Sequence, residues 1–255
     1  MTRMKSRWIS AISSARLAMG GPRLRRLRGK CMNWPVKLSS GDLPRNALVR
    51  VHPAAWKALI QSRGDLTGDP LIEQWASRHW PLVVRRSMPG EGGGIPVGLP
   101  LPPSAGKRRI ALQLKSEDVE SIAAMPRLIE VMTAAPDAWS PTLLALLKIE
   151  DQFHIQTHVV GSLAWQCLTG LHYLTESSDI DLTWSLPRRS CLATLRSELG
   201  NVDENAPMRV DGELVRADGA GVNWRELDDD TAEVLVKTRD SALLCFQHEF
   251  LRDTP

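Results

Sequence analysis

The sequence predicts an α+β protein in which a smaller α/β domain precedes a C-terminal domain built on a mixed sheet with helices. Short apolar segments typical of strands alternate with segments typical of helices along most of the 255 residues. An apolar run over 155–161 ends in Gly-Ser and is followed by a helix-like segment. Residues 178–182 then alternate acidic and aliphatic side chains, as a strand does. The stretch 133–139 is the best boundary between the two halves.

In the first half, turn residues and caps place the elements between the apolar segments. Pro53 suits the first turn of a helix, where its missing N–H group needs no partner. Six glycines and five prolines over 88–106 predict an extended loop. Ser116, which is followed by acidic residues, is typical of a helix N-terminus. The predicted elements are a strand at 48–51, a helix at 54–62, a helix from 70, a strand at 81–86, a strand at 107–114 and a helix at 116–131.

In the second half, Ser140-Pro141 caps a helix that we expect to continue to about Phe153. A strand, a helix and a second strand then follow in close succession. The remaining elements end in a helix at the C-terminus. The predicted bounds are a strand at 155–161, a helix at 163–174, a strand at 179–184, a helix at 188–199, strands at 207–215, 222–226 and 232–237, and a helix at 240–250.

The overall composition is that of an ordinary soluble globular protein, with 43% hydrophobic and 24% charged residues. No apolar run reaches the roughly 18 residues that are needed to span a bilayer, so we expect no membrane association. The four cysteines are scattered, which excludes a short-spaced zinc cluster and gives no hint of a disulfide framework. A reducing cytoplasm is the simplest location.

Charge divides the chain unevenly. Residues 1–41 contain ten Lys or Arg and no acid, whereas the remainder has 22 basic and 29 acidic residues, a net charge of −7. The basic segment could bind nucleic acid or an anionic membrane, or act as an organellar transit peptide. We interpret residues 1–40 as a disordered extension or as translation from an upstream start codon, and we do not expect nucleic-acid binding. The domains are then 41–135 and 136–255.

Asp179 and Asp181 are the strongest candidates for chemistry. On a strand they share one face, roughly 6–7 Å apart. Two such carboxylates can hold two divalent cations about 3.5–4 Å apart. Gly161 and Ser162, at a strand-to-helix turn, offer backbone N–H groups and a hydroxyl to phosphate oxygens. Together these residues predict transfer of a nucleotidyl group, and the alternative is a buried strand with two surface aspartates.

A two-metal site usually needs a third carboxylate, and Asp211 and Glu213 share a face of the next predicted strand. Asp211 is our preferred third ligand, although the sequence leaves both open, and a surface hairpin is the alternative. Gly212 between them predicts a bulge or a close backbone approach. Cations for the phosphates of a substrate are available on two strand ends beside the Gly/Pro loop and on the strand at 232–237. They are Arg85, Arg86, Lys107, Arg108, Arg109 and Lys237.

Gly-Ser after a strand, followed within one helix length by Ser-Asp-Ile-Asp-Leu, resembles the polymerase-β-type nucleotidyltransferase superfamily. This implies a palm-like C-terminal domain. Sixteen residues separate Ser162 from Asp179, which is longer than usual in the superfamily, so we expect an extra turn or loop between them.

Residues 161–174 and 178–182 are also similar to one narrow branch, the malonate decarboxylase holo-acyl carrier protein synthases, or phosphoribosyl-dephospho-CoA transferases. The resemblance covers about residues 43–250 and leaves out the basic extension. Further segments that carry it lie at 81–86, 98–102, 107–110, 211–213, 224–227 and 236–238.

This resemblance implies a reaction and its partners. The donor is 2′-(5″-triphosphoribosyl)-3′-dephospho-CoA, and the acceptor is a serine of the acyl carrier subunit of malonate decarboxylase. The serine attacks the α-phosphorus and pyrophosphate leaves. Mg²⁺, as two ions, is the implied cofactor on Asp179 and Asp181, and Gly161 and Ser162 would hold the triphosphate. The first domain would recognise the dephospho-CoA end of the donor.

Two other functions remain open from the sequence. One is a nucleotidyltransferase with another acceptor, such as a small molecule, an RNA end or a protein, but this leaves the first domain unexplained. The other is a catalytically dead fold that binds nucleic acid through its basic extension, against which the intact acids argue. Release of pyrophosphate in the presence of magnesium separates the enzymes from the binding module. The sequence leaves open the oligomeric state, the metal preference and the surface that docks the carrier.

Overall fold

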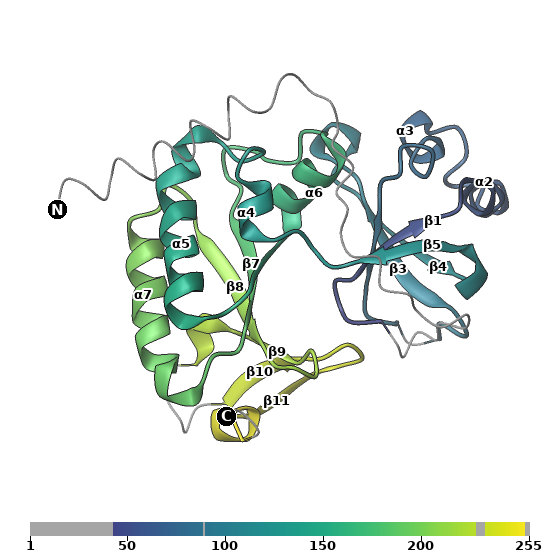
Figure 1. Cartoon of the computed structure of the whole chain (residues 1–255). Coiled ribbons are helices and arrows are strands. Elements are labelled where there is room, and N and C mark those ends of the chain that lie inside the picture. Colours follow the sequence, from purple (N-terminus) through teal and green to yellow (C-terminus); the bar gives the residue numbers. More distant parts are fainter. Residues whose placement is uncertain (1–42, 89, 228–232, 253–255) are drawn as a thin grey trace. The chain divides into compact units, whose positions relative to one another are not determined.

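The computed structural model describes residues 43–88, 90–227 and 233–252. They belong to one compact unit of the chain, Met32–Pro255. The predicted basic extension over residues 1–40 lies outside the described residues. Two sheets organise the described part (Figure 1), one of five strands in the order β4-β3-β2-β1-β5 and one of six in the order β11-β10-β9-β8-β7-β6. The protein is therefore of the α+β class, as predicted.

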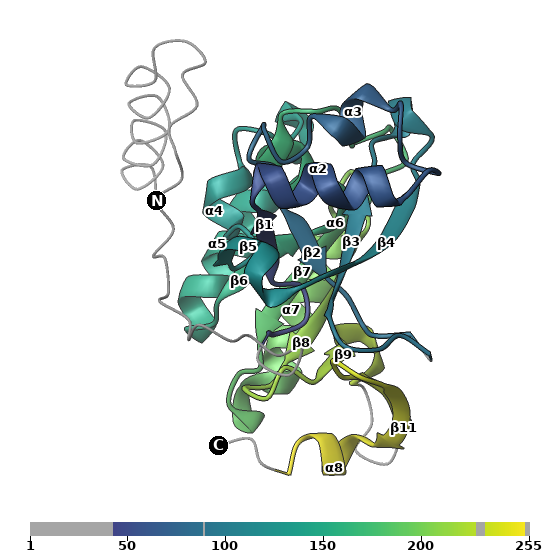
Figure 2. The same cartoon turned by 90° about the vertical axis from the view of Figure 1, so that its right-hand side faces the viewer.

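The first sheet is antiparallel throughout. Helices α2 (Pro53–Ser62) and α3 (Pro70–Glu73) pack on it (Figure 2), and Trp56, Ile60 and Ile72 are buried in the core that they form with the sheet. Its strands are β1 (Leu48–Val51), β2 (Leu82–Val84), β3 (Ile95–Pro100), β4 (Arg109–Leu114) and β5 (Val119–Ala123).

The second sheet is mixed, because β7 and β8 run parallel while the other neighbours are antiparallel. The parallel pair places the starts of β7 and β8 at the same edge of the sheet. The strands are β6 (Thr157–Val160), β7 (Ile180–Ser185), β8 (Val210–Val215), β9 (Gly221–Asn223), β10 (Glu233–Lys237) and β11 (Ala242–Phe246).

Helices cover one face of the second sheet (Figure 1), because alternate strand residues are apolar and point toward them. Ile180, Leu182 and Trp184 of β7 are at most 1% exposed in this core, together with apolar side chains of α5 and α7. The alternate residues of β7 and β8 therefore lie on the opposite face. The helices of this half are α4 (Leu128–Val131), α5 (Ser140–Phe153), α6 (Gly161–Thr169), α7 (Leu192–Glu204) and α8 (Gln247–Phe250).

The segment between α6 and β7 joins the two halves. Helix α6 ends at Thr169, and a loop continues to Asp179, which is the extra loop expected from the long spacing after Ser162. Trp165 and Tyr173 belong to the core of the first sheet, and the Tyr173 hydroxyl donates to the carbonyl oxygen of Pro100 at 2.8 Å. The loop thus fixes the end of β3 beside the second sheet.

Three predicted elements were wrong. The predicted loop over 88–106 contains β3, and the predicted helix over 116–131 contains strand β5, which pairs along its length with β1. The predicted C-terminal helix over 240–250 is β11 followed by the short α8. In the described part of the chain, no helix is long and apolar enough to cross a membrane.

Candidate active site

Asp181 and Asp211 lie side by side on the open face of the second sheet. They are register partners on the parallel strands β7 and β8, and neighbouring strands lie about 4.8 Å apart. On the other side of β7, Val160 at the end of β6 is the register partner of Asp181. Asp179 stands just before β7, at the edge where both strands begin. The fold therefore gathers the predicted carboxylates at one edge of the sheet.

Gly161, the first residue of α6, lies directly against Asp181. Its φ of +65° is in the left-handed region that favours glycine, and an added Cβ would stand 2.8 Å from the Cγ of Asp181. Ser162 follows in the first turn of α6, where backbone N–H groups lack helical partners. The carboxylate and the N-terminus of the helix therefore share one small space, which only glycine permits.

Three carboxyl groups set the electrostatics of this edge. Burial raises the pKa of Asp181 most, and the neighbouring charges of Asp211 and Asp179 raise it further, to about 6. Arg109, at the start of β4 in the first sheet, and Arg209, just before β8, act in the opposite direction. The carboxylates therefore repel one another at neutral pH, and a bound cation would relieve that repulsion.

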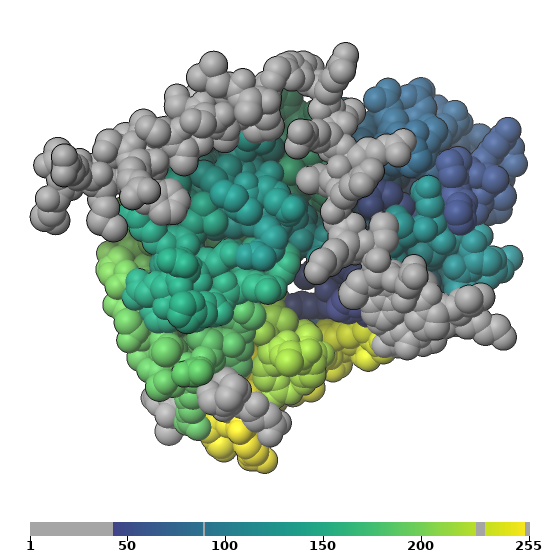
Figure 3. Space-filling model, in the orientation of Figure 1, coloured from purple at the N-terminus to yellow at the C-terminus, as the bar shows by residue number. Residues whose placement is uncertain are grey.

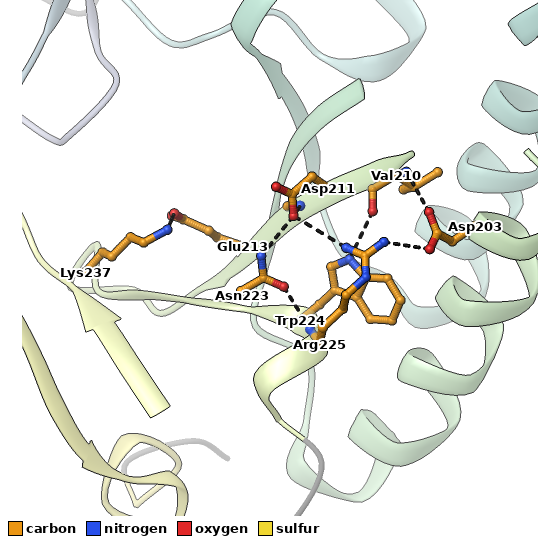
Figure 4. A network of polar contacts seen from close by, with 9 residues as sticks. Asp203, Val210, Asp211, Glu213, Asn223, Trp224, Arg225 and Lys237 are labelled. Carbon is orange, nitrogen blue, oxygen red and sulfur yellow. Dashed lines mark hydrogen bonds and ion pairs between the residues drawn. The ribbon is translucent and has the colours of Figure 1, made fainter. Parts of the chain in front are cut away.

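Asp211 is held in a network of polar contacts (Figure 4). Its Oδ1 accepts hydrogen bonds from the backbone N of Gly212 at 2.9 Å and from Nδ2 of Asn223 at 2.9 Å. Nη1 of Arg225 lies 3.4 Å from the same oxygen. Among the described residues, these contacts all reach Oδ1, so that Oδ2 is available to a further ligand.

Arg225 connects Asp211 to helix α7. Its Nη2 donates to Oδ2 of Asp203 at 2.6 Å, while Oδ1 of Asp203 accepts from the backbone N of Val210 at 2.7 Å. The guanidinium also stacks 4.3 Å from the ring centroid of Trp224. These contacts fix the Arg225 side chain from three sides, and through it the carboxylate of Asp211 (Figure 4).

Glu213 has different partners. Its carboxylate pairs with Arg45, which precedes the first sheet, and accepts from Nζ of Lys237 at 2.9 Å. Burial alone raises the pKa of Glu213, but the charge of Arg45 and hydrogen bonds from Arg45 and Lys237 outweigh it and hold the pKa below its ordinary value. This carboxylate is occupied by two cations, so the geometry favours Asp211 over Glu213 as the third acid.

Asp181, Asp211 and Glu213 line a cavity of about 250 Å³ on the open face of the sheet, whereas Asp179, Gly161 and Ser162 are not part of its lining. In the described residues, no three His, Cys, Asp or Glu side chains converge as a ready metal site. Magnesium, however, is usually bound through one or two carboxylates together with substrate phosphates and water. The lining residues are Arg45, Asn46, Val160, Asp181, Leu182, Thr183, Asp211, Gly212, Glu213, Asn223 and Lys237.

Comparison with known proteins matches both halves of the chain to one family. Residues 44–124 match the family described as phosphoribosyl-dephospho-CoA transferase MdcG N-terminal domain, and residues 127–248 match the corresponding C-terminal domain. A phosphoribosyl-dephospho-CoA transferase of Bradyrhizobium diazoefficiens is 42% identical over 222 residues, which cover 86% of this chain and 97% of that protein. The chain belongs to the phosphoribosyl-dephospho-CoA transferase family.

Other relatives agree with this assignment. A protein of the same name from Xanthomonas axonopodis pv. citri is 37% identical over 207 residues, 78% of this chain and 92% of that protein. One from Pseudomonas putida is 28% identical over 164 residues, 64% of this chain and 78% of that protein. No solved structure matches the chain. The two matched segments meet between residues 124 and 127, whereas the boundary predicted from the sequence lies near 135.

Within this transferase, the five predicted cations of the first sheet lie in two separate groups. The backbone N of Arg85 donates to Pro96 at the start of β3, whereas Arg109 is the register partner of Pro100 at its end. Four residues of a strand span about 13 Å. Arg86 accompanies Arg85, and Lys107 and Arg108 accompany Arg109. The five do not form one patch.

Their contacts differ as well. Arg85 is paired with Glu91 and donates from Nε to the carbonyl oxygen of Val97 at 3.1 Å. Its guanidinium therefore stabilises the loop before β3. Arg108 donates to Oδ2 of Asp69 at 2.9 Å. Arg109 is exposed and lies near enough to lower the pKa of Asp181. Of these five cations, Arg109 is the one whose charge acts on Asp181.

Sequence reasoning missed four site residues of this transferase. Arg45 is 168 positions from Glu213 in the chain, and no local pattern marks it. Arg209 lies within the predicted strand at 207–215, and Asn223 and Arg225 lie within the one at 222–226, but no acidic or glycine motif of their own marks them. The segment 224–227 carries part of the family resemblance, and this was the available signal for Arg225.

Proposed function

We propose that the protein transfers the phosphoribosyl-dephospho-CoA group from 2′-(5″-triphosphoribosyl)-3′-dephospho-CoA to a serine of the acyl carrier subunit of malonate decarboxylase. The bond between the serine Oγ and the α-phosphorus forms. The bond from the α-phosphorus to the oxygen that bridges to the β-phosphorus breaks, and pyrophosphate leaves. The serine proton passes to a solvent water molecule.

The observation that carries this proposal is the register of Asp181 with Asp211, beside the turn at Gly161. The fold thus provides adjacent carboxylates and the free N–H groups of a helix N-terminus within one space. Phosphoryl transfer requires such groups, because its catalysis consists mainly of positioning the reactants and of stabilising charge.

The cavity residues fit divalent cations. Arg45 and Lys237 offset only two of the three negative charges on Asp181, Asp211 and Glu213, so the lining has a formal charge of −1. Such a site repels a polyphosphate unless cations accompany it. We propose Mg²⁺, as two ions, held by Asp179, Asp181 and Asp211. When bound, Mg²⁺ neutralises phosphate charge and lowers the pKa of the attacking hydroxyl.

The chain's own groups then have distinct tasks. The N–H groups at Gly161 and Ser162 and the Ser162 hydroxyl hold the outer phosphates of the triphosphate. Arg109 adds positive charge from the first sheet. Asn223 and Arg225 keep Oδ1 of Asp211 occupied, which leaves Oδ2 to hold a metal ion.

The reaction would take place in the cytoplasm. The described cysteines, Cys167, Cys191 and Cys245, are free thiols, which agrees with a reducing compartment.

The test is incubation of the purified protein with the triphosphoribosyl donor, MgCl₂ and the apo carrier subunit, followed by intact-protein mass spectrometry. We expect the carrier to gain one phosphoribosyl-dephospho-CoA group and free pyrophosphate to appear in equal amount. EDTA, or Asp181→Asn in a folded protein, should abolish both. An unmodified carrier with the wild-type protein would contradict the proposed acceptor, and unchanged transfer in EDTA would contradict the metal.

A further inference from the structure

A pair of cations lies in the cavity beyond Asp211, on the side away from Gly161. Arg45 and Lys237 approach the two carboxylate oxygens of Glu213, Arg45 at Oε2 and Lys237 at Oε1. Their side chains are 15% and 33% exposed, and that of Glu213 is 16% exposed. Figure 3 shows purple atoms from the start of the described chain against yellow-green atoms of the second sheet.

The positive charges of Arg45 and Lys237 together exceed the negative charge of Glu213. One carboxylate balances one cation, so the group of Arg45, Glu213 and Lys237 keeps a net charge of +1. A guanidinium has five N–H donors and an ammonium three, and each side chain gives one hydrogen bond to Glu213. Both side chains therefore retain donors that face the cavity they line. An anion is the ligand that suits them.

The anion cannot be the same phosphates that lie at the Gly161 turn. Glu213 is on β8, two strands from β6, which is about 10 Å at the usual strand spacing. Glu213 is also two residues farther along its strand than Asp211. A pyrophosphate group is too short to reach from one position to the other. The two phosphate-binding positions therefore lie on opposite sides of the carboxylates.

A second cavity adjoins Arg45. Arg45, Asn46 and Thr183 line both the carboxylate cavity and a second cavity of about 260 Å³. The second one is lined in part by Ala47, Met125 and other apolar groups. A ligand that begins at the carboxylates can thus extend over Arg45 into space for a larger, less polar portion.

We propose that Arg45 and Lys237 bind the 5′-diphosphate of the dephospho-CoA portion of the donor, with Glu213 positioning both cations. This rests on the proposed donor, which carries phosphates at two separated places, the reacting triphosphate and the diphosphate of dephospho-CoA. Gly161 and Ser162 hold the first and Arg45 with Lys237 hold the second, so the donor spans the carboxylates. The first domain thus recognises the donor through Arg45 rather than through Arg85.

The experiment measures equilibrium binding of two donor fragments, 3′-dephospho-CoA and pyrophosphate, to the full chain with MgCl₂. We expect Arg45→Met and Lys237→Met each to weaken 3′-dephospho-CoA binding at least tenfold and to change pyrophosphate binding less than twofold. Ser162→Ala should show the reverse pattern. Arg45→Lys should recover part of the affinity, because it restores the charge without the fork of donors.

Arg127→Met is the matched control. Arg127 makes a comparable ion pair with Glu150, and neither residue lines the two cavities. This variant should bind both fragments as the wild type does. If Arg45→Met folds poorly, Lys237→Met carries the test alone, since its partner Glu213 keeps Arg45.

The outcomes separate this inference from the proposed reaction. Unchanged 3′-dephospho-CoA binding in folded Arg45→Met and Lys237→Met overturns the inference, even if the wild type modifies the carrier. Equal losses of affinity for 3′-dephospho-CoA and for pyrophosphate overturn the inference too, because the two cations would then act on all phosphates alike. If the two cation variants bind as expected and the wild type leaves the carrier unmodified, the acceptor alone is wrong.

Discussion

Gly161 and Asp181 occupy adjoining space so closely that no side chain fits between them. An added Cβ at Gly161 would lie 2.8 Å from Cγ and 3.1 Å from Cβ of Asp181. The contact follows from the pairing of β6 with β7, which sets Val160 beside Asp181 and begins α6 at the next residue. Position 161 must therefore be glycine for two reasons: the turn needs a left-handed backbone, and the Asp181 carboxylate leaves no space for a side chain.

Gly161→Ala should reduce transfer more than tenfold while the protein still folds. The methyl group forces either the Asp181 carboxylate or the N-terminus of α6 to move. Gly170→Ala is the matched control, because Gly170 ends the same helix at φ +72° with nothing within 4 Å of an added Cβ. Both variants should lose about 1 kcal/mol of stability from the left-handed backbone. Equal transfer rates in the two variants would contradict the close-contact argument.

Asp181→Asn should stabilise the metal-free protein at neutral pH, although it abolishes transfer. The pKa of Asp181 is about 6 in the fold against an ordinary 3.8, so folding disfavours the charged form. The resulting loss in the free energy of unfolding of the wild type is absent below pH 3.8 and grows as pH rises toward 6. Above pH 6 it is constant, at no more than about 3 kcal/mol. Urea unfolding in EDTA should show the variant more stable at pH 7.5 and equal to the wild type at pH 3.5. A variant less stable at both pH values contradicts the raised pKa of Asp181.

The sequence predicted most elements of the second sheet but missed strands in both sheets, for different reasons. In β3, Ile95, Val97 and Leu99 are buried and alternate as a strand requires, but prolines and a glycine between them predict a loop. Strand β5 exists because it pairs with β1, about 70 residues earlier. Ser116, which the sequence predicted as a helix cap, is the first residue of a single turn, Ser116–Asp118, capped by Lys115. Local patterns carry no information about such pairings.

In the candidate site, too, the residues of a local motif could be predicted and those that distant segments contribute could not. Asp179, Asp181 and Gly161 belong to one local motif, and the structure brings them together. Gly212 was expected at a close backbone approach, which is confirmed, since an added Cβ would lie 2.6 Å from the carbonyl oxygen of Leu182. Arg45 could not be found, because its position over β8 depends on how the start of the first sheet meets the second.

Arg85 should prove structural, and its loss should lower stability rather than donor affinity. Glu91, its partner, has a pKa lowered to about 2, mainly through the hydrogen bonds from Arg85. A lowered pKa means that the pair stabilises the fold above pH 4.5 and that this contribution disappears as pH falls toward 2. Arg85→Met should therefore have a lower Tm than the wild type at pH 7, with a difference that narrows on acidification.

Steady-state kinetics complete this test. Arg85→Met should keep the wild-type KM for the donor, whereas Arg109→Met should raise it several-fold with little change in Tm. Arg109 is exposed and its charge acts on Asp181, so its removal takes positive charge from the donor site without loosening the fold. A raised KM in Arg85→Met with an unchanged Tm would show that Arg85 contacts the donor after all.

Arg225 should act by positioning Asp211, and its loss should therefore change the metal requirement of the reaction. Its guanidinium joins Asp203 at 2.6 Å to Asp211 at 3.4 Å, and without it one constraint on Oδ1 of Asp211 is gone. We expect Arg225→Met to lower kcat about tenfold. The MgCl₂ concentration for half-maximal rate should rise several-fold. Asp203→Asn should reproduce both effects more weakly, because Arg225 then keeps its stacking on Trp224. If Arg225 were merely structural, its loss would lower the Tm and leave the magnesium dependence of the rate unchanged. Titrating the rate of the folded variants with MgCl₂ distinguishes the two roles.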